Sequence, residues 1–130
     1  MEFKKRGTLF VPVKPVMLEF KCVCERQELS SGKLYLYIKL GDSQKNRIHD
    51  IHKASNDHLT GKLMNPLQGD LLKVKVPYKY DKVACKVSGN KAVQELVKGD
   101  QVTVSIEYCG VWAVNGYCGP SWKLFSLEYR

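Results

Sequence analysis

Three histidines and five cysteines are the residues of this chain that could ligate a metal or act in catalysis. His49 and His52 flank Asp50, and His58 follows further along, but this spacing matches no zinc signature. The sequence also contains no glycine-rich phosphate loop, no nucleophile elbow and no cluster of paired carboxylates. We therefore predict a binding protein rather than an enzyme, with no cofactor and no metal.

The cysteines allow an alternative, a structural zinc site. Cys22 and Cys24 share one face of a predicted strand, and Cys109 and Cys118 could complete four thiolate ligands. The pairs lack the Cys-x-x-Cys spacing of zinc knuckles, and cysteine is often simply a small buried residue. With Cys85 the number of cysteines is odd, and no secretory signal is recognisable, so reduced thiols in the cytoplasm or nucleus are expected.

Lysine and tyrosine residues suggest a different chemistry. Two ammonium groups and two rings share one face of a predicted strand: Lys33, Tyr35, Tyr37 and Lys39. A second strand presents three more ammonium groups: Lys73, Lys75 and Lys79. Rings that stack on unpaired bases and cations that neutralise phosphates are what a non-specific binder of single-stranded nucleic acid needs. The competing interpretation is an ordinary solvated sheet surface, because tyrosine is a favoured strand residue.

The charge balance favours a polyanionic partner. The chain has 21 Lys and Arg residues against 13 Asp and Glu residues, a net charge of +8, and a pI near 9.3. Only four of the cations are arginine. Lysine suits phosphates without reading base edges bidentately, so the composition favours binding to the nucleic-acid backbone over reading of its sequence.

Three further aromatic residues lie near a glycine-rich connection, residues 109–121: Trp112, Tyr117 and Trp122. We expect at least one of these rings to contact bases. Trp122 has an alternative role, that of filling one end of the core, because tryptophan is as common in cores as in interfaces.

Hydrophobic alternation predicts the strands that must position these groups. Period-two patterns occupy residues 16–25, 33–40, 72–79 and 102–108, and a final strand is expected over 122–130. Pro12 and Pro15 predict an edge or a bend before the first strand. A short helix is predicted over 91–98, ending at Gly99. The polar stretch from Gly41 to Gly69 lacks this pattern, with a second short helix possible around 44–59.

Residues 96–104 (LVKGDQVTV) and 119–127 (GPSWKLFSL) resemble the fourth and fifth strands of the OB-fold single-stranded DNA-binding proteins. The resemblance implies an all-β fold with one short helix, a five-stranded Greek-key OB-fold barrel formed as a single domain over residues 1–130. The compact size is similar to that of phage or viral members, and a viral member would act inside the host cell.

The resemblance also implies a function. We expect a largely sequence-non-specific protein that coats and protects single-stranded DNA during replication or recombination. Its site would combine the faces of the second and third strands with the loop at 109–121. An RNA-binding OB module and a small β-barrel module that docks an acidic protein are the alternatives. A homo-oligomer is possible, and no membrane segment is expected, since no apolar run reaches 18 residues.

Overall fold

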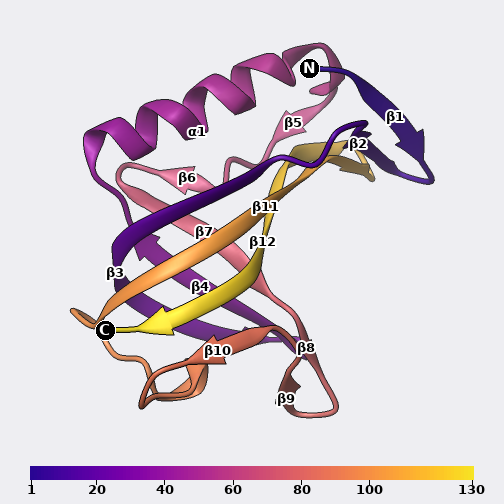
Figure 1. Ribbon diagram of the computed structural model, residues 1–130. Coiled ribbons are helices and arrows are strands. Elements are labelled where there is room, and N and C mark those ends of the chain that lie inside the picture. The colour runs from indigo at the N-terminus through magenta and orange to yellow at the C-terminus, as the bar shows by residue number, and fades with distance from the viewer.

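The computed structural model describes residues 1–130 and consists mostly of β-strands (Figure 1). Five strands form most of its main sheet: β3 (Met17–Ser30), β4 (Lys33–Lys39), β7 (Leu71–Val76), β11 (Gln101–Val114) and β12 (Tyr117–Tyr129). The single α-helix, α1 (Asp42–Ala54), lies across one end of this sheet. None of the helical segments has the length and the apolar composition of a membrane span.

The five strands are linked by pairings that connect distant parts of the chain. β3 pairs with β4, and β4 pairs with β7, both antiparallel. β7 meets β12 in the parallel sense, at Lys75 opposite Lys123. β11 pairs antiparallel with β12 on one side and with β3 on the other. Each of the five strands therefore has a neighbour among the other four on both of its edges.

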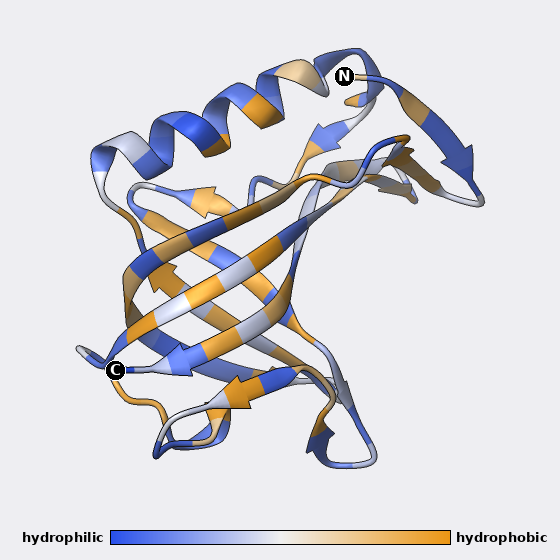
Figure 2. Ribbon diagram, in the orientation of Figure 1, coloured by the Kyte–Doolittle hydropathy of each residue, from blue (hydrophilic) through white to orange (hydrophobic).

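Strict alternation along β4 separates the core from the surface. Leu34, Leu36 and Ile38 are at most 2% exposed, and they pack with the alternate residues of β3, β7, β11 and β12 in one hydrophobic cluster. The same alternation appears as bands along the strands in Figure 2. Of the inward set predicted for the first strand, Leu18, Phe20, Cys22 and Cys24 are buried, and Val16 is partly buried against the core.

One stripe of α1 and its C-cap faces the core at spacing i, i+3, i+4 and i+7: Ile48, His52 and the C-cap Ser55 are buried, and Ile51 is partly buried. The Trp122 indole N–H donates to His52 Nε2 at 2.9 Å, and the Ser55 and Tyr108 hydroxyls share a hydrogen bond of 2.6 Å. Compared with the helix predicted around 44–59, α1 begins two residues earlier and ends at Ala54. It is followed by a 3-10 turn, η1 (Asn56–His58).

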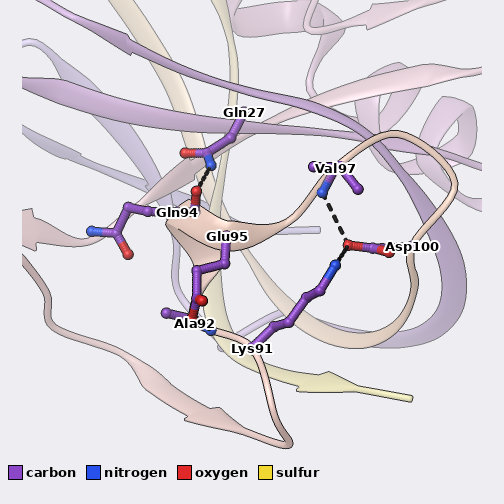
Figure 3. Close-up of polar contacts among 7 residues, drawn as sticks. All are labelled: Gln27, Lys91, Ala92, Gln94, Glu95, Val97 and Asp100. Carbon is purple, nitrogen blue, oxygen red and sulfur yellow. Dashed lines mark hydrogen bonds and ion pairs between the residues drawn. The ribbon is translucent and has the colours of Figure 1, made fainter.

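The other end of the sheet is covered by residues 91–100, where the predicted helix is wrong. Only a 3-10 turn forms, η2 (Val93–Glu95), because a two-turn helix has little stability of its own and the chain is held instead by specific polar contacts (Figure 3). Asp100 Oδ2 accepts hydrogen bonds from Lys91 Nζ at 2.8 Å and from the Val97 amide at 3.0 Å. These hydrogen bonds hold the pKa of Asp100 below its ordinary range.

Several short strands complete the fold. An N-terminal hairpin of β1 (Phe3–Arg6) and β2 (Leu9–Pro12) extends the sheet beyond β11, as an edge predicted from the prolines. The other short strands are β5 (Lys62–Leu63), β6 (Leu67–Gln68), β8 (Tyr78–Lys79), β9 (Lys82–Val83) and β10 (Lys86–Ser88). Phe10 stacks on His58, with ring centroids 4.5 Å apart, and so attaches the hairpin to η1.

The expected loop at 109–121 is instead a long hairpin. β11 continues to Val114 and β12 begins at Tyr117, so only Asn115 and Gly116 form the turn, both with positive φ. The other two glycines of this segment lie within the strands. At Gly110 the Phe10 backbone of β2 approaches closely, and a Cβ at position 119 would clash with the Met64 carbonyl oxygen. These glycines admit neighbouring backbone rather than provide flexibility.

The Gly119 contact predicts the effect of a substitution. Gly119→Ala should destabilise the fold by about 2 kcal/mol, because the segment after β5 must move away from β12. Gly41→Ala is the matched control, since a Cβ there meets nothing closer than Gln44 Oε1 at 3.9 Å. Urea unfolding of both variants measures the difference, and equal stabilities would contradict the close approach.

A second prediction concerns stability against pH. Burial, with a smaller contribution from His49, lowers the pKa of His52 from 6.5 to about 4. Between these values the unfolded chain binds a proton that the folded chain does not, so the contribution of His52 is complete above pH 6.5. As the pH falls from 6.5 to 4, we expect the free energy of unfolding to decrease by up to about 3 kcal/mol through His52.

The matched variant is His52→Gln, whose amide oxygen can still accept the Trp122 hydrogen bond but does not titrate. Urea unfolding at a series of pH values should show a steeper loss of stability in the wild type than in the variant between pH 6.5 and 4. Parallel profiles would contradict the role of His52.

Candidate nucleic-acid interface

The predicted aromatic strand faces outward as expected. Tyr35 and Tyr37 are half-buried on the outer face of β4, while the residues between them are in the core. On the neighbouring β7, Lys75 lies opposite Tyr35 and Lys73 lies opposite Tyr37. Two rings and two ammonium groups therefore occupy adjacent positions on one surface, which we call the tyrosine face.

Each of these rings has a cation over it. The Lys73 ammonium lies 4.2 Å from the centroid of the Tyr35 ring, and the Arg26 guanidinium lies 3.9 Å from that of Tyr37. Such contacts are worth about 0.5 to 1 kcal/mol at exposed sites. They hold both rings on the sheet and keep positive charge beside the surface on which a base could stack.

Arg26 was missed by the sequence analysis because strict alternation from Cys24 would turn it inward. The register of β3 against β4 shifts between Cys24 and Arg26, where Cys24 lies opposite Ile38 and Arg26 opposite Tyr37. Glu25 is the extra residue of this bulge, so the alternation is reset and Arg26 points outward. No residue in this stretch is a sequence signal for the bulge.

The tyrosine face carries more positive charge than its acidic neighbours neutralise. Lys33, Lys73 and Lys75 form no ion pair. Lys39 and Lys123 have acidic partners only at 3.9 Å, Asp70 and Glu107, and the side chains of both pairs are 36% to 57% exposed. Exposed pairs of this kind contribute little and are easily replaced. Lys123, opposite Lys75 on β12, extends the face beyond the predicted residues.

Lys79 is placed apart from the other predicted lysines. It belongs to β8, which pairs with β9 in a separate two-stranded hairpin below the main sheet (Figure 1). The turn of this hairpin consists of Tyr80 and Asp81, with φ of 54° and 60°. Tyr80 is 85% exposed, and the Lys79 ammonium lies 5.4 Å from its ring centroid. A second aromatic and cationic feature thus stands at this end of the molecule.

The three aromatic residues of the β11–β12 hairpin have different surroundings. Tyr117 is 45% exposed beside the turn, where Lys62 Nζ lies 5.9 Å from its ring centroid. Trp112 is half-buried opposite Gly119, with its indole nitrogen close to that glycine. Trp122 is 1% exposed and is held by His52 and Tyr108. Its placement as a base contact is therefore corrected to the alternative, that of filling the core.

The cysteines and histidines do not cluster into a metal-binding site. No group of three or more His, Cys, Asp or Glu side chains lies close enough to hold a metal ion. Burial raises the pKa of Cys22 to about 12 and of Cys24 to about 11, so both thiols stay protonated at neutral pH.

Comparisons of this chain with known proteins find no relative. No family model matches this chain, and neither a curated protein nor a solved structure matches it significantly. A function for this chain must therefore be inferred from the chemistry of the tyrosine face.

Proposed function

We propose that this protein binds single-stranded nucleic acid, and single-stranded DNA in particular, along the tyrosine face. The observation that carries the proposal is the register of β4 against β7, which sets Tyr35 beside Lys75 and Tyr37 beside Lys73 on one outward surface. Stacking is worth about 1 to 3 kcal/mol per base and does not depend on base identity. Two rings beside ammonium groups that form no ion pair suit a strand of any sequence.

We also propose that the fold is an OB-fold. In the order of the five long strands along the chain, the pairings run first, second, third, fifth, fourth and back to the first, with the third and fifth parallel. A closed Greek-key barrel has this connectivity. The position of the helix departs from the expected one, because α1 lies between the second and third long strands and only η2 lies between the third and fourth.

Binding would use the cation contacts of the free protein. A base that stacks on Tyr37 would have to displace the Arg26 guanidinium, which lies 3.9 Å from the ring centroid, and the displaced cation would then be free to pair with a phosphate. Lys33, Lys73 and Lys75 have no acidic partner to give up. For these three lysines the attraction of a phosphate costs no internal ion pair, and coating of DNA during replication or recombination is the role that such binding supports.

The first test of this function is salt dependence. If about five phosphates are neutralised, the logarithm of the affinity for oligo-dT should fall with that of the salt concentration at a slope of about −3.5. Competition by oligo-rU and by duplex DNA at fixed salt ranks the sugar and strand preference. An absence of binding to any oligonucleotide would contradict the proposal and leave a module that docks an acidic protein.

The rings are tested by a matched pair of double variants. Tyr35→Ala with Tyr37→Ala should weaken oligo-dT binding about tenfold or more, because two stacking surfaces are lost. Tyr35→Phe with Tyr37→Phe keeps the ring faces and should bind nearly as the wild type does. Fluorescence titration measures both, and equal affinity of the two double variants would contradict stacking on this face.

The β8–β9 hairpin supplies a further prediction. Two-residue turns with positive φ at both positions favour Asn-Gly, so Tyr80 and Asp81 are unfavourable turn residues and the exposed ring needs another explanation. We infer that Tyr80 contacts the bound strand. Tyr80→Asn with Asp81→Gly should raise the stability of the fold by about 1 kcal/mol and yet weaken binding to long oligonucleotides.

Thermal unfolding and titration of the same variant separate the two effects. Tyr80→Phe is the control that retains the ring, and it should retain the affinity. A variant that is more stable and binds as tightly as the wild type would show that the hairpin takes no part in binding.

A further inference from the structure

A polar cleft of about 200 Å³ lies where α1 and η1 meet β5 and β12. Its polar lining consists of His49, His52, Lys53, Asn56 and Asn65. Leu59, Leu63 and Pro120 form its apolar wall. None of these residues belongs to the tyrosine face, and no acidic side chain lines the cleft.

The hydrogen bond from Trp122 fixes which nitrogen of His52 carries the proton. The indole N–H donates to Nε2, so Nε2 must present a lone pair and the proton of the neutral ring is on Nδ1. Burial keeps the ring neutral at pH 7, since the pKa of His52 is lowered to about 4. Every buried side-chain nitrogen or oxygen has a hydrogen-bond partner, whereas no protein group accepts a hydrogen bond from Nδ1. Nδ1 is therefore not among the buried atoms, and His52 lines the cleft. Nδ1–H is therefore a donor that solvent in the cleft can reach.

Asn65 can likewise act only as a hydrogen-bond donor toward the cleft. Its Oδ1 accepts a hydrogen bond of 3.0 Å from the Leu67 amide, which leaves the side-chain NH2 as the group available to a ligand. Lys53 is exposed and forms no ion pair. Three groups from α1 and the segment after β5 thus offer N–H donors and one positive charge, and no carboxylate competes for them.

We propose that this cleft binds a phosphate group, carried either by a small phosphorylated compound or by the end of a nucleic-acid strand. Several N–H donors around one cation, without a neighbouring acid, satisfy the oxygens of an oxyanion. The apolar wall of Leu59, Leu63 and Pro120 then covers the part of the ligand next to the phosphate. This site is separate from the proposed function, which does not depend on it.

The probe for the test is inorganic phosphate. In Trp112→Phe protein, Trp122 is the only tryptophan, and its indole contacts a residue that lines the cleft. Phosphate at pH 7 should change the Trp122 fluorescence saturably and raise the melting temperature by about 5 °C at ten times its dissociation constant. Sodium chloride at equal ionic strength should do neither, and an equal response to chloride would overturn the proposal.

Asn65→Asp is the decisive variant. The carboxylate can still accept the Leu67 amide hydrogen bond, but it replaces the donors by negative charge, so the response to phosphate should be lost. Asn90→Asp makes the same chemical change at an exposed position outside the cleft and should respond as the wild type does. If Asn65→Asp fails to fold, Lys53→Met serves instead, with at least a fivefold loss of phosphate affinity expected. A variant that binds phosphate as Asn90→Asp does would overturn the proposal.

The source of the phosphate is resolved with oligonucleotides that differ only at one end. A 5′-phosphorylated oligo-dT that binds the wild type more tightly than its 5′-hydroxyl form, with the gain absent in Asn65→Asp, assigns the cleft to a strand end. Equal binding of the two forms, with inorganic phosphate still bound, assigns it to free phosphorylated compounds. Binding of oligo-dT without any response to phosphate would refute the cleft site and leave the proposed function intact.

Discussion

Alternation along β4 and β7 is the constraint on which the rest of the molecule depends. Successive side chains of a strand point to opposite faces, so burial of Leu34, Leu36 and Ile38 obliges Tyr35 and Tyr37 to face outward. A slip of one residue would expose the core and bury the phenols together. Burial of the core therefore fixes the face on which the candidate interface lies, because the two sets of side chains belong to the same strands.

The ends of the sheet are secured by different chemistry. At one end α1 is fixed by hydrogen bonds between side chains, those of His52 with Trp122 and of Ser55 with Tyr108. At the other end the segment around η2 is held by Asp100, through Lys91 and the backbone amide of Val97. The α1 hydrogen bonds therefore join the helix to the sheet, whereas those of Asp100 fix the shape of the segment itself, and the buried side-chain nitrogen and oxygen atoms all have partners.

The two proposed sites differ in shape and in the groups that form them. The tyrosine face is an open surface on the sheet, where exposed cations and rings suit a long polymer that is bound at many points. The cleft beside α1 is small and depends on a histidine whose tautomer is set by the core through Trp122. Pro120, which lines the cleft, and Lys123 of the tyrosine face both belong to β12.

Much of the fold follows from the sequence, because a period of two is a local property. The inward sets of β3 and β4, the outward set Tyr35 and Tyr37, and the edge formed by the N-terminal segment are all predicted from neighbouring residues alone. Even the hairpin turn had a local signal in Asn115-Gly116, although the flanking glycines concealed it. The stripe of α1 was harder to recognise, since His52 and Ser55 are polar and find their partners only across the core.

Other features were decided by contacts between segments that are distant in the chain. The bulge at Glu25, which appears only in the register of β3 against β4, turns Arg26 onto Tyr37. The indole N–H of the buried Trp122 finds its acceptor in His52, which the fold of α1 brings to it. The backbone of Met64 lies against Gly119 and leaves no room there for a side chain. The sequence by itself determined which face of each strand is apolar, whereas register, bulges and close backbone approaches depend on partners that only the folded chain brings together.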